Sequence, residues 1–216
     1  MHPLWAAALL ATAAARTFGP DKLPEVADAA DPLVDAASVV PKLIVDLRYA
    51  TADNFAGKAL YPKDTVCLLR RSVAERLALA AKIVAKEKLR LVAWDCLRSP
   101  EAHAALWKAH PEAGSVADPG RGSLHERGVA VDVGLAAWDG GSVELPTAFD
   151  AFGPSAAADA RLPEGPAKRH RDLLLSAMRS AGFRPNPKEW WHFARLYGWR
   201  WPLVTARTPR VQSPAK

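Results

Sequence analysis

The spacing of apolar residues along the chain predicts three helices. Residues 72–88 carry an apolar stripe at helical spacing, with Ser72 as a candidate cap. Residues 100–109 begin with a proline where a first turn would be, and residues 167–181 end just before Gly182. Apolar positions repeating every three or four residues indicate a helix, proline is common in its first turn, and glycine often follows its end.

Shorter apolar runs bounded by turn residues predict strands. These runs are residues 42–49, 89–94, 129–133, 143–145 and 189–193. Two stretches rich in small and turn-forming residues, 111–123 and 152–167, predict loops. Because strands and helices are mixed without a regular β–α–β rhythm, we expect a single domain of the α+β class.

The N-terminus predicts a secreted protein. Residues 1–15 are apolar, rich in Leu and Ala, and end in small residues before Arg16, as a secretory signal does. The run is shorter than the roughly 20 residues that a membrane span needs, so we expect no integral membrane segment once it is removed. The predicted location is therefore the periplasm or the medium. If the run is instead an Ala-rich first helix that is not cleaved, the location is cytoplasmic.

The remaining boundaries follow from composition. Residues 16–41 are rich in Ala, Asp and Pro and predict an extended lead-in, residues 42–201 predict the main domain, and residues 202–216 predict a frayed tail. The 216 residues carry a formal net charge of +6, with 29 Lys and Arg against 23 Asp and Glu. The basic residues are scattered, and no basic helix is found, so nucleic acid is not an expected partner.

The chain has two cysteines, Cys67 and Cys96. Two thiols alone make a poor structural zinc site. An oxidising compartment would permit a disulfide between them, and two buried free thiols are an equally good interpretation.

Two segments contain the residue types of a catalytic metal site. One is SLHERGVAVD, with His125 and Asp132, and the other is EWWH, with Glu189 and His192. Two imidazoles and a carboxylate form the ligand set of a catalytic zinc that keeps one position open for water. A carboxylate at Asp132 inside an apolar strand would be costly to bury unless a cation or hydrogen bonds satisfied it. Glu189, three residues before His192, is placed to accept a proton from the attacking water.

A third segment, WDCLRSP, places Arg98 where a strand gives way to a helix. A guanidinium there could hold an oxyanion or a substrate carboxylate, with Asp95 orienting it. An ordinary salt bridge at the start of a helix is the alternative. Three other histidines are interpreted as packed or surface residues without a chemical role: His103, His110 and His170.

Together these segments resemble the zinc D-alanyl-D-alanine dipeptidases, part of a wider family of D,D-carboxypeptidase-like metallopeptidases. SLHERGVAVD is similar to the SxHxxGxAxD motif and EWWHF to the ExxH motif, and the resemblance extends over about residues 42–195. It implies a compact α+β domain around a central antiparallel sheet with about three flanking helices, one Zn²⁺ per chain, and the dipeptide D-Ala-D-Ala as substrate.

The resemblance also implies a role for each site residue. His125, Asp132 and His192 match the zinc ligands, Glu189 the general base and Arg98 the arginine that stabilises the transition state. Two further residues match positions that line the dipeptide pocket: Ser123, and Asp150, which suits the ammonium group of the substrate.

The sequence departs from the family pattern around two of these residues. Leu97 and Ser99 flank Arg98 where Tyr and Pro are usual, and Glu126 follows the first ligand where a small polar residue is common. These departures bear on substrate preference. One alternative is therefore a D,D- or L,D-carboxypeptidase that trims peptidoglycan stem peptides. Another is a non-catalytic wall-binding module with structural zinc, which would have no need of a base at Glu189.

Overall fold

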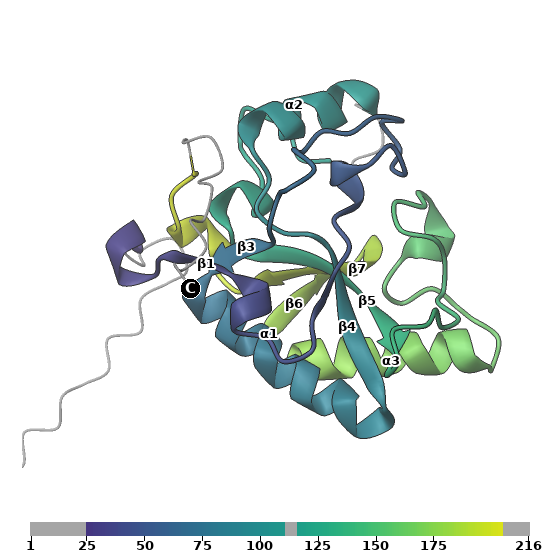
Figure 1. Cartoon of the computed structure of the whole chain (residues 1–216). Coiled ribbons are helices and arrows are strands. Elements are labelled where there is room, and N and C mark those ends of the chain that lie inside the picture. Colours follow the sequence, from purple (N-terminus) through teal and green to yellow (C-terminus); the bar gives the residue numbers. More distant parts are fainter. Residues whose placement is uncertain (1–24, 111–115, 205–216) are drawn as a thin grey trace, which may run out of the picture.

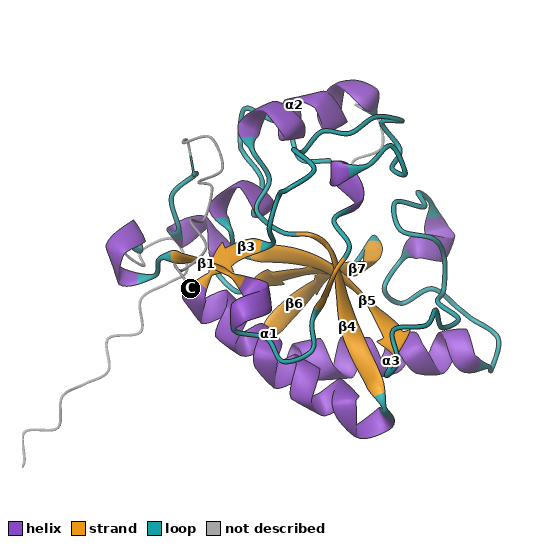
Figure 2. Ribbon diagram, viewed as in Figure 1, coloured by secondary structure: helices purple, strands orange, loops and turns teal. Residues whose placement is uncertain are grey.

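A five-stranded sheet forms the centre of the fold in the computed structural model (Figures 1 and 2). Its strand order is β2-β4-β5-β7-β6, and each neighbouring pair is antiparallel except β2 and β4 at one edge, which are parallel. The strands span Ile44–Val45 (β2), Leu89–Asp95 (β4), Ala130–Ala137 (β5), Phe183–Asn186 (β6) and Glu189–Arg195 (β7). The predicted α+β class with a mainly antiparallel central sheet is confirmed.

Three α-helices flank this sheet: Arg71–Val84 (α1), Pro100–Ala109 (α2) and Pro166–Ser180 (α3). Helices α1 and α3 pack against each other and against the sheet, whereas α2 lies apart from them at the top of Figure 1. The apolar stripe that predicted α1 is buried, including Val73, Leu77 and Val84. The three predicted helices are thus confirmed. Helices α1 and α3 bury their apolar faces against the sheet, and the core also includes Ala102 and Leu106 of α2.

The start of α1 differs from the prediction. The helix begins at Arg71, and Ser72 does not act as its cap. Instead, Asp31 accepts hydrogen bonds from the Ser72 backbone nitrogen (2.8 Å) and from its hydroxyl (2.6 Å). A carboxylate distant in the sequence therefore satisfies the helix start, a contact that local spacing does not predict.

A small second sheet pairs Leu33–Asp35 (β1) with Leu68–Arg70 (β3) in antiparallel register. Its first strand lies within residues 16–41, the predicted extended lead-in. A disulfide joins Cys67, which precedes β3, to Cys96, which follows β4. Of the two interpretations of the cysteines, the structure therefore has the disulfide.

Two strand predictions need correction, and one strand of the central sheet was not predicted. In residues 42–49 only Ile44–Val45 is a strand, and Arg48–Ala50 forms a short 3-10 helix. Residues 143–145 form no strand, and only Ser142 bridges to β5. Strand β6 was not predicted, because it contains Pro185 and prolines are rare inside sheets; β6 lies at the edge, where proline is tolerated.

The structure describes residues 25–110 and 116–204. The predicted signal, part of the lead-in, the start of the 111–123 loop and most of the predicted tail lie outside these residues. Within the described part of the chain, no helix is long and apolar enough to cross a membrane.

Candidate metal centre and active site

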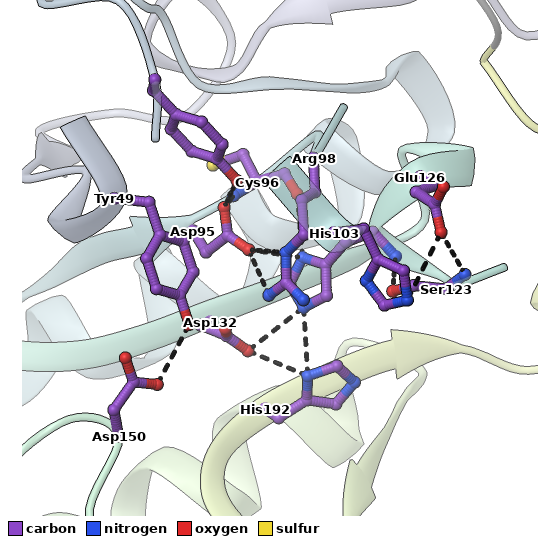
Figure 3. Close-up of polar contacts among 12 residues, drawn as sticks. Tyr49, Asp95, Cys96, Arg98, His103, Ser123, Glu126, Asp132, Asp150 and His192 are labelled. Atoms are coloured by element: carbon purple, nitrogen blue, oxygen red, sulfur yellow. Dashed lines mark hydrogen bonds and ion pairs between the residues drawn. The ribbon is translucent and has the colours of Figure 1, made fainter. Parts of the chain in front are cut away.

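Three predicted metal ligands, which come from separate elements, meet at one point. Figure 3 shows two of them, Asp132 and His192, with the contact between them. His192 Nδ1 lies 2.9 Å from Asp132 Oδ1 and 3.1 Å from His125 Nε2, and His125 Nε2 lies 3.4 Å from Asp132 Oδ1. Asp132 is on β5, His192 on β7, and His125 begins a short 3-10 helix, His125–Arg127. The structure thus brings together the three residues that the sequence singled out.

The register of the sheet explains why two of these ligands face each other. In the pairing of β5 with β7, Asp132 is directly opposite His192, and in the pairing of β4 with β5, Asp95 is opposite Asp132. Residues directly opposite in an antiparallel pair present their side chains on the same face of the sheet. Three polar side chains of adjacent strands therefore form one row.

The geometry of the three donor atoms fits a tetrahedral metal ion. Ligand atoms bound to zinc at roughly 2.0–2.1 Å in a tetrahedron lie about 3.3 Å apart. The three separations of 2.9, 3.1 and 3.4 Å bracket that value. The Nδ1 atom of His125 lies 2.8 Å from the Cys96 carbonyl oxygen, which can only accept a hydrogen bond. That bond places the His125 proton on Nδ1. The Nε2 atom then has a free lone pair for a metal ion, on the side of Asp132 Oδ1 and His192 Nδ1.

Within the triangle, the pKa values of Asp132 and His192 are shifted from their ordinary values. Burial by itself would raise the pKa of Asp132, but His125 and His192 outweigh burial and hold this pKa well below its ordinary value. Burial lowers the pKa of His192, and the hydrogen bond and charge of Asp132 more than compensate and raise it. Asp132 is therefore an ionised carboxylate, as a metal ligand must be.

Glu189 lies beside the donor triangle but outside it. Its Oε2 atom is 3.8 Å from His192 Nδ1 and accepts a 2.7 Å hydrogen bond from Asn186 Nδ2. Burial, followed by the charge of Asp132, raises the pKa of Glu189 above its ordinary value. A buried carboxylate with a raised pKa next to a metal position has the properties of a general base.

Arg98 is held rigidly just after the end of β4. Its Nε and Nη2 atoms donate to Asp95 Oδ2 at 3.0 and 2.7 Å, and its guanidinium lies over the Tyr49 ring, 5.2 Å from the ring centroid. Asp95 is fully buried and also accepts a 2.5 Å hydrogen bond from the Tyr61 hydroxyl. The sequence predicted the orienting role of Asp95, and the structure has that contact (Figure 3).

Asp150 reaches the same cavity from a loop. Its backbone adopts a positive φ of 60°, and its Oδ1 atom accepts a 3.1 Å hydrogen bond from the Tyr49 hydroxyl. Its Oδ2 atom is buried and has no hydrogen-bond partner among the described residues. Burial and the charge of Asp132 raise the pKa of Asp150 to about 8. A buried oxygen without a partner at a cavity wall is a ready acceptor for a cationic group.

Ser123 lies two residues before His125, and its hydroxyl accepts a 3.0 Å hydrogen bond from the His125 backbone nitrogen. The Ser123 backbone nitrogen donates to Glu126 Oε2 at 2.6 Å, and His103 Nε2 is 3.8 Å from that same oxygen. Glu126, the residue that departs from the family pattern, is thus buried and holds the segment that carries the first ligand.

All seven predicted site residues line one cavity of about 300 Å³. Aromatic rings close part of its wall, since Phe55 and Phe152 have ring centroids 5.1 Å apart and His110 packs against Phe152 at 4.3 Å. Tyr49, Tyr61 and Asn186 have no role predicted from the sequence, and Glu126 is marked only as a departure from the family pattern. All four lie within residues 42–195, which the resemblance covers, but nothing in their local spacing predicts the contacts that they make.

The α+β fold holds a His–Asp–His donor triangle, a neighbouring buried carboxylate and a fixed guanidinium. These features make the chain a candidate metal-dependent hydrolase. Comparison with known proteins gives the family. Residues 29–197 match the model of the D-ala-D-ala dipeptidase family of peptidases, and the match begins inside the predicted lead-in. The chain belongs to this family.

Individual relatives agree with this assignment. The chain is 36% identical to the D-alanyl-D-alanine dipeptidase of Escherichia coli (strain K12) over 182 residues, which is 84% of this chain and 94% of the relative. It is 29% identical to the D-alanyl-D-alanine dipeptidase of Enterococcus faecium, and 31% identical to that of Streptomyces coelicolor. Each of these two matches covers 68% of this chain and 83% of the relative.

Proposed function

We propose that this chain is a zinc-dependent dipeptidase that hydrolyses D-alanyl-D-alanine or a closely related short D-amino-acid dipeptide. The observation that carries the proposal is a triangle of His125, Asp132 and His192 donor atoms in a cavity of about 300 Å³ that also contains Glu189, Arg98 and Asp150. The names of three relatives support the choice of substrate.

His125, Asp132 and His192 would hold the ion. A bound Zn²⁺ supplies Lewis-acid polarisation of a carbonyl and lowers the pKa of water towards about 7. Glu189 accepts the proton of the attacking water and delivers it to the leaving amine, a role for which its raised pKa is suited. Arg98, fixed by Asp95, stabilises the oxyanion that develops on the scissile carbonyl.

The two ends of the substrate need separate partners. The Asp150 carboxylate, oriented by Tyr49, is the proposed partner of the substrate ammonium group. Pairing with a cation also satisfies the buried Oδ2 atom, which has no partner in the part of the chain that the structure describes. Ser123 is proposed to line the remainder of the pocket. An ammonium anchor at the wall favours a free dipeptide over the end of a long stem peptide.

The decisive experiment measures zinc content together with D-alanine release. We expect one zinc per chain, release of D-alanine from D-Ala-D-Ala, loss of activity on chelation, and recovery when zinc is added back. A pentapeptide ending in D-Ala-D-Ala serves as the competing substrate. Faster cleavage of the pentapeptide than of the dipeptide would replace the proposal with a carboxypeptidase, and zinc binding without turnover of either would indicate a binding module.

We further propose that the protein is exported through residues 1–15 to the periplasm or the medium. The disulfide between Cys67 and Cys96 supports this proposal, because structural disulfides persist mainly in oxidising compartments. Cell fractionation with N-terminal sequencing of the mature protein tests it. A soluble cytosolic protein that retains Met1 would contradict it.

A further inference from the structure

The disulfide is adjacent to the candidate metal centre. Cys67 and Cys96 are both buried, with exposed fractions of 0% and 1%. Cys67 directly precedes β3 of the small sheet, and Cys96 directly follows β4 of the large sheet. The crosslink therefore ties the two sheets together at the end of β4, where residues 95–98 turn into the cavity.

Residues 95–98 carry two parts of the site. The Cys96 carbonyl oxygen lies 2.8 Å from His125 Nδ1, and the Arg98 backbone nitrogen donates to the His125 carbonyl oxygen at 3.3 Å. Asp95 in turn holds the Arg98 guanidinium. The backbone at Cys96 therefore orients one proposed ligand, His125. The neighbouring Asp95 orients the Arg98 guanidinium. Carbonyl groups that accept from a ligating histidine fix its tautomer and ring orientation.

Only the first residue of this segment, Asp95, belongs to the central sheet. The pairing of β4 with β5 is irregular between Ala93 and Asp95, and β4 ends at Asp95. Beyond that point, the segment is attached to the β3 strand by a backbone hydrogen bond from Leu97 to Leu68 (3.0 Å) and by the disulfide next to it. The disulfide therefore anchors the chain just after the point where the pairing of β4 with β5 ends.

We propose that the Cys67–Cys96 disulfide positions the metal centre: it holds the Cys96 carbonyl against His125 and keeps Arg98 in place. The disulfide form therefore binds zinc more tightly and turns over faster than the dithiol form of the same chain. The inference rests on the proposed function, in which His125 is a zinc ligand.

The test compares two redox forms of the full chain. One sample is kept oxidised, the other is reduced with a phosphine, and thiols are counted in denaturant. Zinc affinity is measured by competition with a chelating dye, and kcat and KM are measured on D-Ala-D-Ala. Loss of an outer contact to a ligand typically weakens metal binding 10–100-fold, so we expect a shift in Kd of about that size on reduction. We also expect a smaller zinc-induced rise in Tm.

Two variants separate positioning from general stability. The double variant Cys67→Ala with Cys96→Ala is expected to have the weak zinc affinity of the reduced form and to be insensitive to the phosphine. The matched control is Leu77→Ala, which removes a fully buried side chain of α1 but keeps the crosslink and the contacts of residues 95–98. The control is expected to lower Tm because it leaves a cavity, while zinc affinity and kcat stay at the wild-type level.

The outcomes are distinguishable. If the reduced chain and the double variant lose Tm but bind zinc with the affinity of the oxidised chain, the disulfide is only a stabilising crosslink and the inference is wrong. If the double variant does not fold, the reduced wild-type chain, kept below its Tm, decides the question. If the oxidised chain itself binds no zinc, the proposed function fails first, and this inference fails with it.

Discussion

Replacing the proposed general base tests the chemistry most directly. Glu189→Gln preserves the size of the side chain, and its amide oxygen can still accept the hydrogen bond from Asn186. The substitution therefore removes proton acceptance and little else. Positioned general bases contribute about 10²–10⁴-fold, which corresponds to about 2.7–5.4 kcal/mol of barrier. We expect kcat for D-Ala-D-Ala to fall by that factor while KM changes by less than about threefold.

Zinc content is the second readout of this variant. Because Glu189 Oε2 lies outside the donor triangle, 3.8 Å from His192 Nδ1, one zinc per chain should remain bound. D-Alanine release is followed with a coupled oxidase, and bound metal by elemental analysis. Glu75→Gln, at an exposed position of α1, is the matched control and should behave as wild type. A Glu189→Gln protein with wild-type kcat would refute the role of base, and one without zinc would make Glu189 a ligand.

The same residue sets the direction of the pH dependence. A base acts only when it has lost its proton, so activity should fall as pH decreases through the pKa of Glu189. Burial raises that pKa above the ordinary value of a glutamate, so the acid limb of kcat should lie at higher pH than an ordinary glutamate would give. In Glu189→Gln this limb should disappear from the residual activity.

Two further predictions concern substrate binding and packing. The pKa of Asp150 is raised to about 8, so its carboxyl group is mostly protonated at pH 6, and KM for D-Ala-D-Ala should decrease as pH rises from 6 towards 8. Asp150→Asn should raise KM and flatten this dependence, and an unchanged KM would contradict its role as partner of the ammonium group. A Cβ at Gly134 would lie 2.2 Å from the Trp94 ring, so Gly134→Ala should destabilise the protein by about 1–3 kcal/mol and lower its Tm. The control is Gly165→Ala, where the space is open, and equal Tm values for the two variants would contradict the packing argument.

The sequence predicts the helices of this fold well and its short strands poorly. The apolar stripe of α1 is buried, Pro100 marks the start of α2, and Gly182 follows the end of α3. Local patterns are therefore enough to predict these helices. Strand β6 and the pair β1–β3 depend on partners elsewhere in the chain. Their sequences contain no alternation that distinguishes them from loops, since tertiary pairing, not propensity, makes them strands.

The candidate site divides in a similar way. Asp132, Glu189 and His192 are predictable because polar groups of metal-ligand type are rare inside apolar strands. His125 lies outside the strands and is predictable because its segment resembles a known motif. The supporting contacts are not predictable, because they join residues far apart in the sequence. Tyr61, for example, lies 34 residues from the Asp95 carboxylate to which it donates.

The pairing of strands β5 and β7 holds two of the three proposed metal ligands in position. Asp132 and His192 are directly opposite each other in the ladder between β5 and β7. A slip of one residue would turn Asp132 to the other face of the sheet and replace it with a valine. Because Val131 and Val133 are fully buried, the core itself resists such a slip, and these two ligands stay in register as long as the sheet is intact.

His125 has no such protection, because it lies in a 3-10 turn outside the sheet. Its ring is oriented instead by the Cys96 carbonyl, and its backbone is held by Ser123 and Arg98. The contacts that hold His125 come from the segment next to the disulfide and from the segment that buried Glu126 anchors. Perturbations that leave the sheet folded should therefore act on the candidate metal centre first through His125.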